Sequence, residues 1–88
     1  MLPERVVRVS DDVVFKPVGE EMVLLDFQSG MYYGLDPVGV RIWQLIAAQH
    51  PLGDIVETLL AEYDVTRADL ERDVDALVEE LERRGLVS

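Results

Sequence analysis

The sequence contains no cysteine, a single histidine and three serines. The absence of cysteine excludes disulfides, thiolate metal ligands and a thiol nucleophile. His50 stands before Pro51 in an expected loop, so a serine–histidine catalytic arrangement has little support. Gly30, Gly34 and Gly39 have the wrong spacing for a dinucleotide-binding or phosphate-binding motif. We therefore expect a protein that is not an enzyme and that binds no cofactor.

The sequence also lacks a long apolar run and is poor in basic residues. No run approaches the ~18–20 apolar residues that span a bilayer, and residues 1–12 have no apolar signal region. This predicts a cytoplasmic protein without membrane contacts. Eight basic residues stand against 18 acidic ones, for a net charge of −10. Residues 53–88 hold eleven of the acids and four of the bases. Such a surface repels the phosphates of nucleic acids and favours neutral or basic partners.

Apolar residues make up 49% of the 88 residues, which is ample for the core of one domain over residues 1–88. Residues 1–12 read as an N-terminal arm, in which Arg5–Val9 forms either a short strand or an extended segment. Three apolar runs, at 13–18, 22–27 and 31–35, are separated by turns that contain glycine. This pattern predicts three antiparallel strands joined by short loops.

Two helices are expected to follow the strands, each with its own start signal. Asp36 is a good N-cap, and Pro37 suits the first helical position because its missing N–H is not needed there. This helix should extend to about Gln49. A second helix is expected to open at Asp54, with Glu57 three residues later as the partner in a capping box.

The third helix has the clearest local signature. Thr66 is the expected N-cap and Asp69 lies three residues later. Gly85 follows two arginines and marks the end, while Leu86 and Val87 should pack back on the domain. The sequence thus predicts an α+β fold resembling a winged helix-turn-helix, with a three-stranded antiparallel sheet followed by three helices.

Strand 31–35 is the candidate binding element. The alternation of side chains places Tyr33 and Leu35 inward, and Gly34 marks either a close approach of another backbone or a bulge. A free edge on this strand, beside the third helix, would form a groove for an added peptide strand. Residue patterns alone leave two alternatives open, namely an edge covered by Arg5–Val9 and an edge covered by a second copy of the chain.

The helix-turn-helix layout also raises the hypothesis of a DNA-binding regulator. The expected recognition helix begins at residues 67–73, which hold three acids and two bases. Phosphate contacts supply much of the affinity for DNA, so this composition disfavours DNA binding. A metal site at Asp69, Asp73 and Glu80 is also disfavoured, because no histidine accompanies them and such spacing is typical of a solvated helix face. A purely structural dimerisation module remains as a further alternative.

Five short motifs stand in a fixed order within residues 13–87. They are Val23-Leu-Leu-Asp, Ser29-Gly-Met-Tyr-Tyr-Gly-Leu-Asp, Gly39-Val-Arg-Ile-Trp, Tyr63-Asp-Val, and Asp73-Val followed by Leu81 and Arg84-Gly-Leu. In this order and spacing the chain resembles the PqqD-like recognition elements of pathways that modify ribosomally made peptides. It is most similar to the stand-alone B1 proteins of lasso-peptide clusters.

The resemblance implies a non-catalytic adaptor that binds the leader segment of a precursor peptide as an added strand. It would present the precursor to a separate leader protease and macrolactam synthetase, as a monomer or weak homodimer. A carrier for a radical-SAM maturase is the alternative within the family. Carried over by position, the leader-binding residues are Met31, Tyr32, Tyr33, Gly34, Leu35, Asp69, Asp73, Val74, Leu77 and Glu80. Val74 and Leu77 are equally well interpreted as core residues, and the three acids as solvated charges.

Overall fold

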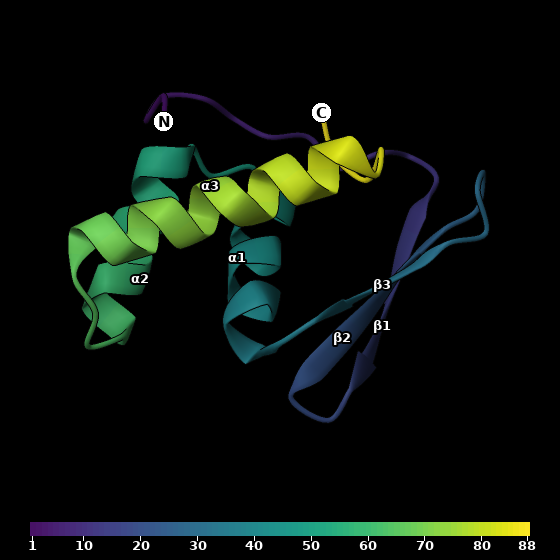
Figure 1. Cartoon of the computed structure of the whole chain (residues 1–88), viewed down its shortest axis with the longest axis horizontal. Helices are drawn as coiled ribbons and strands as arrows, with labels where there is room; N and C mark the ends of the chain where they lie inside the picture. The colour runs from purple at the N-terminus through teal and green to yellow at the C-terminus, as the bar shows by residue number, and fades with distance from the viewer.

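The computed structural model describes residues 1–88, and its sheet precedes its helices (Figure 1). The elements in chain order are β1 (Val13–Val18), β2 (Glu21–Asp26), β3 (Tyr32–Leu35), α1 (Pro37–Ala47), α2 (Leu52–Glu62) and α3 (Arg67–Arg83). The expected α+β fold, with a three-stranded antiparallel sheet followed by three helices, is confirmed. None of the helices is both long enough and apolar enough to cross a membrane.

The sheet has the strand order β1-β2-β3, so β3 lies at one edge. In the β2–β3 ladder Leu24 pairs with Tyr33, and Val23 pairs with Gly34. The register is regular through Gly34, so no bulge occurs there. A β-carbon added at Gly34 would meet no atom within 4 Å. The bulge interpretation of Gly34 is therefore wrong, and this glycine is not required by packing within the chain.

The turn between β2 and β3 is held by the side chain of Asp26, which is buried. Its carboxylate accepts hydrogen bonds from the Gln28 N–H (3.1 Å) and the Ser29 hydroxyl (3.0 Å). The Ser29 oxygen accepts in turn from the Met31 N–H (3.2 Å). Gly30 completes the turn with φ 71°, a conformation that favours glycine. Because Met31 belongs to this turn, β3 begins at Tyr32, one residue later than expected.

The N-terminus of α1 is capped as expected. The Asp36 carboxylate accepts from the Gly39 N–H at 2.7 Å, and Pro37 is the first helical residue. A β-carbon at Gly39 would lie 3.2 Å from the Leu35 side chain, so this glycine permits close packing of α1 on β3. The helix ends at Ala47, two residues before the expected Gln49. Gln49 itself has φ 65°, which is incompatible with helix continuation.

The expected start of α2 at Asp54, with Glu57 completing a capping box, is wrong. The helix begins at Leu52 without a side-chain cap. Its first N–H groups are instead satisfied by the arm, since Leu52 donates to the carbonyl of Arg5 (2.9 Å) and Gly53 to that of Pro3 (2.8 Å). Backbone carbonyls from a segment distant in the sequence therefore replace the local cap.

The signals at both ends of α3 are confirmed. The Thr66 hydroxyl accepts from the Asp69 N–H at 3.2 Å, and Gly85 has φ 72° just past the helix. Leu86 and Val87 are buried, as expected. The tail is held by Arg8 of the arm, whose N–H and carbonyl both bond to Ser88 (2.9 and 2.8 Å).

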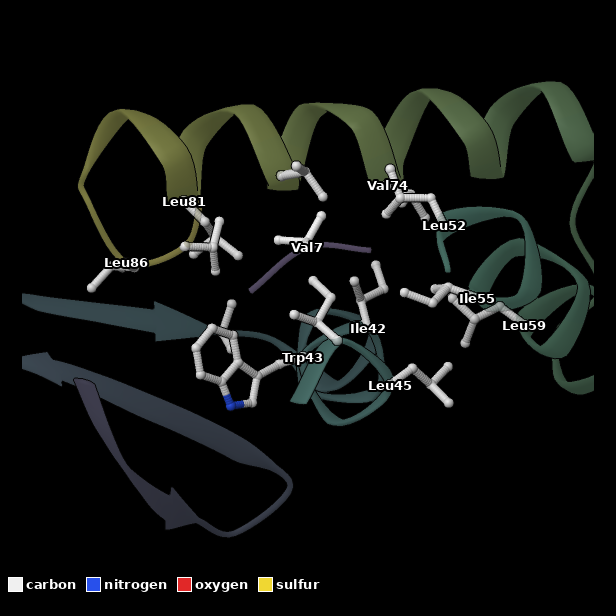
Figure 2. Packing of buried hydrophobic residues seen from close by; sticks show 14 of the residues in the cluster. Val7, Ile42, Trp43, Leu45, Leu52, Ile55, Leu59, Val74, Leu81 and Leu86 are labelled. Carbon is white, nitrogen blue, oxygen red and sulfur yellow. The ribbon is translucent and has the colours of Figure 1, made fainter. Parts of the chain in front are cut away.

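One core joins the arm, β2, the end of β3 and the three helices. Figure 2 shows Val7 of the arm among side chains from the helices, with Ile42 and Trp43 from α1 and Val74 and Leu81 from α3. Val7 is buried, so the arm is part of the fold. The sheet reaches this core mainly through β2 and the last residue of β3.

Candidate functional site

The edge of β3 that faces away from β2 is open. The Asp26 N–H donates to the Met31 carbonyl at 3.1 Å, next to the paired residues Leu25 and Tyr32, so it marks a hydrogen-bonded position at the end of the ladder. In an antiparallel ladder such positions alternate, so the Tyr33 N–H and C=O groups also point to β2. The same groups of Tyr32 and Gly34 point outward. The edge therefore offers hydrogen-bonding groups at two of the four residues of β3.

The N-terminal arm does not cover this edge. It contacts the α1–α2 connection through a bridge between Val6 and Pro51, and the C-terminal tail through a bridge between Val9 and Val87. In Figure 1 the arm runs along α3 toward the C-terminus before it enters β1. The alternative in which Arg5–Val9 covers the β3 edge is therefore wrong.

A cleft of ≈ 400 Å³ adjoins the C-terminal half of β3. We call it the Asp73 cleft. Tyr33, Gly34, Leu35 and Asp36 line it from the strand and its end. Val38, Gly39 and Ile42 line it from α1, and Asp73 and Leu77 from α3. The cleft is thus built from both halves of the chain, with the open edge of the strand along one side.

A smaller hollow of ≈ 140 Å³ lies at the N-terminal end of β3. We call it the Arg84 hollow. Tyr32 and Tyr33 line it from the strand, Asp26 from the end of β2, and Ser29 and Met31 from the turn between the two strands. Arg84 and Leu86 line it from the segment just past α3. Tyr33 borders both this hollow and the Asp73 cleft.

Tyr33 is held against the end of α3 by a stacking contact. The Arg84 guanidinium lies 4.8 Å from the centre of the Tyr33 ring, close enough for a cation–π interaction. Arg84 is itself oriented by Glu80, whose carboxylate accepts from the Arg84 Nε at 2.7 Å. This chain of contacts joins β3 to the end of α3 beside the Arg84 hollow.

The same contacts change the pKa of the Glu80 carboxyl. Its pKa is lowered, chiefly by the hydrogen bond from Arg84 and further by the positive charges of Arg83 and Arg84, against an opposing effect of desolvation. Arg83 lies 3.3 Å from the second carboxylate oxygen. Glu80 therefore forms ion pairs with two arginines of the same chain.

The predicted site residues fall into distinct groups in the structure. Tyr33, Gly34, Leu35, Asp73 and Leu77 come together around the Asp73 cleft. Met31 and Tyr32 border the Arg84 hollow, with Tyr32 largely exposed.

The other three predicted site residues lie outside both hollows. Val74 is 0% exposed and belongs to the core. Asp69 is exposed and paired with Arg72, and Glu80 is paired with the two arginines that follow it.

Eight residues border the two hollows without having been predicted as site residues. Four of them belong to the start of α1, namely Asp36, Val38, Gly39 and Ile42. The other four are Asp26 and Ser29, before β3, and Arg84 and Leu86, just past the end of α3. The Asp-Pro helix start directly after strand 31–35 was the available signal for α1, because it places the first turn of a helix beside the end of the strand. Nothing in the local sequence of Arg84 indicates its contact with Tyr33.

The structure provides no group of three or more histidine, cysteine or carboxylate side chains arranged to hold a metal ion. Asp69 and Glu80 are paired with arginines, so the three predicted acids, Asp69, Asp73 and Glu80, do not converge. What the arrangement offers is a strand edge, apolar side chains and one unpaired carboxylate, Asp73. These are groups for binding an extended chain.

Comparisons with known proteins agree with this geometry. The family model described as "Coenzyme PQQ synthesis protein D (PqqD)" matches residues 21–87. The chain is similar to a solved structure of TbiB1 in complex with the TbiA(beta) leader peptide, with 40% identity and a TM-score of 0.88. That match covers 92% of this chain and 94% of the other.

The chain is also similar to a structure of a lasso peptide synthetase B1 complexed with the leader peptide. The identity is 33% and the TM-score 0.88, and the match covers 96% of this chain and 99% of the other. No curated protein matches the chain.

Proposed function

The chain belongs to the PqqD family, and from this we propose that it is a non-catalytic adaptor that binds the leader segment of a precursor peptide in lasso-peptide biosynthesis. The observation that carries the proposal is the open edge of β3 beside the Asp73 cleft. Two similar proteins, at 40% and 33% identity, are described as complexes with leader peptides, which supports the same ligand class here.

The leader would bind as a fourth strand along β3. Its backbone would bond to the outward N–H and C=O groups of Tyr32 and Gly34, which gives affinity without regard to side chains. Leader side chains opposite Tyr33 and Leu35 would point to the helix side, where Leu77 forms an apolar wall. The helix-side positions would therefore supply the sequence specificity.

The chemistry of maturation would reside in other proteins. We expect a leader protease and a macrolactam synthetase to act on the bound precursor in the cytoplasm. Holding the leader raises the effective concentration of the attached core peptide near these enzymes. Leader binding would thus increase the rate of processing, although this chain would supply no catalytic group.

A binding titration tests the proposal. The probe is a fluorescein-labelled synthetic leader from the precursor gene that neighbours the gene for this chain, and fluorescence anisotropy should give micromolar or tighter affinity. Leu77→Asp should abolish binding because it places a charge on the apolar wall of the cleft. Leu60→Asp is the matched control, since Leu60 is also half-buried against the core but lies on α2. Both variants are compared at equal folded fraction, measured by circular dichroism.

Amide exchange tests strand addition directly. Addition of the leader should protect the amides of Tyr32 and Gly34, whereas the Tyr33 amide should be protected already in the free protein. Absence of leader binding contradicts the adaptor function. Tight, salt-sensitive binding to duplex DNA would favour the regulator hypothesis instead.

A further inference from the structure

Given the proposed function, we propose that Asp73 is a specificity-determining residue, which selects leaders that place a lysine or arginine side chain in the Asp73 cleft. The proposal names the chemistry of one leader position, whereas the adaptor function requires only that a leader binds along β3.

Asp73 differs from the other two predicted acids of α3 in having no internal partner. Asp69 pairs with Arg72, and Glu80 pairs with both Arg83 and Arg84. Asp73 takes part in none of the ion pairs or side-chain hydrogen bonds of the structure, although it lines the cleft beside the open strand. The Asp73 carboxylate is therefore available to a ligand, whereas the carboxylates of Asp69 and Glu80 are already paired with arginines.

The remaining lining of the cleft suits a long side chain with a cationic end. Leu35, Val38 and Leu77 supply apolar surface, and no basic residue lines the cleft. Lysine and arginine pack an aliphatic stem on apolar surface and keep a charged end group for a polar partner. A bound leader would also shield Asp73 from water, which strengthens its attraction for a cation.

A second carboxylate adds to the negative potential of the cleft. Asp36 lines it, and one of its oxygens accepts the N–H of Gly39 at the start of α1. This capping bond commits Asp36 to the helix, so Asp36 contributes charge while Asp73 remains the unpaired acceptor. An acidic leader side chain at this position would face two carboxylates and no cation.

The register of the strand predicts where the basic residue lies. The leader residue that bonds to Gly34 has its side chain on the outer face of the sheet, because opposed residues of an antiparallel pair point to the same face. The residue opposite Leu35 points to the helix side, into the cleft. The basic residue should therefore be the immediate neighbour of the residue that bonds to Gly34.

A double-mutant cycle tests the proposal with the synthetic leader described above. Each lysine and arginine of the leader is replaced in turn by glutamine, and each peptide is titrated against wild-type protein and Asp73→Asn. One replacement should weaken binding to the wild type by about tenfold, or about 1.4 kcal/mol. The same replacement should change binding to Asp73→Asn by less than about twofold, because the partner charge is already absent.

Glu79→Gln is the matched control. Glu79 is an exposed acid of the same helix with no ion-pair partner, and it lies outside the Asp73 cleft. This variant removes the same charge, so its affinity for the leader should stay within about twofold of the wild type. An equal loss in Glu79→Gln and Asp73→Asn would show that only the overall negative charge matters.

The outcomes separate this proposal from the adaptor function. Failure of the wild-type protein to bind the leader contradicts the adaptor function itself. Tight binding without coupling between Asp73 and any basic leader residue overturns the specificity proposal alone. Charge reversal gives an independent check, since Asp73→Lys should restore affinity for a leader whose basic residue is replaced by glutamate.

Discussion

Gly34→Pro is the substitution that most directly tests the role of the β3 edge. The Gly34 N–H points away from β2, so its removal takes no hydrogen bond from the sheet. Proline is tolerated on edge strands in this orientation. A β-carbon at this position meets nothing within 4 Å, so the folded chain has room for a side chain. The change therefore acts on the surface that an added strand would use.

The expected loss can be worked from the hydrogen bonds. The missing N–H removes one backbone bond to the leader, worth about 1 kcal/mol. The leader carbonyl that it served is left facing the proline ring and unsatisfied, which costs a further ~1–3 kcal/mol. A total of about 2 kcal/mol or more corresponds to a loss of about 30-fold or more in affinity.

Fluorescence anisotropy with the labelled leader measures this loss, and thermal unfolding measures stability. Gly34→Ala is the control, because it adds a β-carbon and keeps the N–H. Tyr32→Pro provides a second test at the other outward position of β3. If Gly34→Pro binds the leader as tightly as Gly34→Ala while both are folded, the edge of β3 is not the binding surface.

Three further predictions concern binding, stability and pH. Gly34→Val should weaken leader binding more than folding, because valine favours strands and its β-carbon meets no atom of the chain, whereas its methyl groups would crowd the leader residue opposite Gly34. An equal loss in titration and unfolding would make Gly34 purely architectural. Val74→Ala should lower the free energy of unfolding by about 2 kcal/mol because Val74 is fully buried, and denaturant unfolding checks this. The lowered pKa of Glu80 means that its ion pairs stabilise the fold above the unfolded-state pKa of about 4.5, and this stability is lost as the pH falls through the lowered value. The stability difference between wild type and Glu80→Gln should therefore shrink in acid, and a difference that is independent of pH would contradict the assignment.

Local chemistry explains why the order of elements could be predicted from the sequence. Asp36-Pro37 and Thr66 act within their own helix starts, and their capping bonds form as expected. The start of α2 could not be predicted in this way. Its N–H groups are satisfied by carbonyls of Pro3 and Arg5, about 50 residues earlier in the chain, and no local pattern reports such a contact.

Part of the candidate site could be predicted from the sequence. The alternation of side chains along a strand and their spacing along a helix define which residues share a face. Tyr33 and Leu35 lie inward as predicted, and Asp73 and Leu77 reach the same cleft. Helical spacing could not distinguish Asp73 from Asp69 and Glu80, because their difference depends on which carboxylates the arginines already occupy. Which carboxylate pairs with which arginine depends on the side-chain rotamers and on where α3 ends, so this pairing can be seen only in the structure.

The direction of the hydrogen-bonding groups on β3 has a consequence for the evolution of the precursor gene. Amide and carbonyl groups are common to nearly all amino acids, so the proposed recognition through Tyr32 and Gly34 would leave the codons for leader residues on the outer face of the sheet free to drift. The codons for leader residues that face α3 would be under selection, because their side chains would have to fit the Asp73 cleft. Adaptor and leader should therefore coevolve at alternate positions, while the intervening positions of the leader diversify without loss of processing.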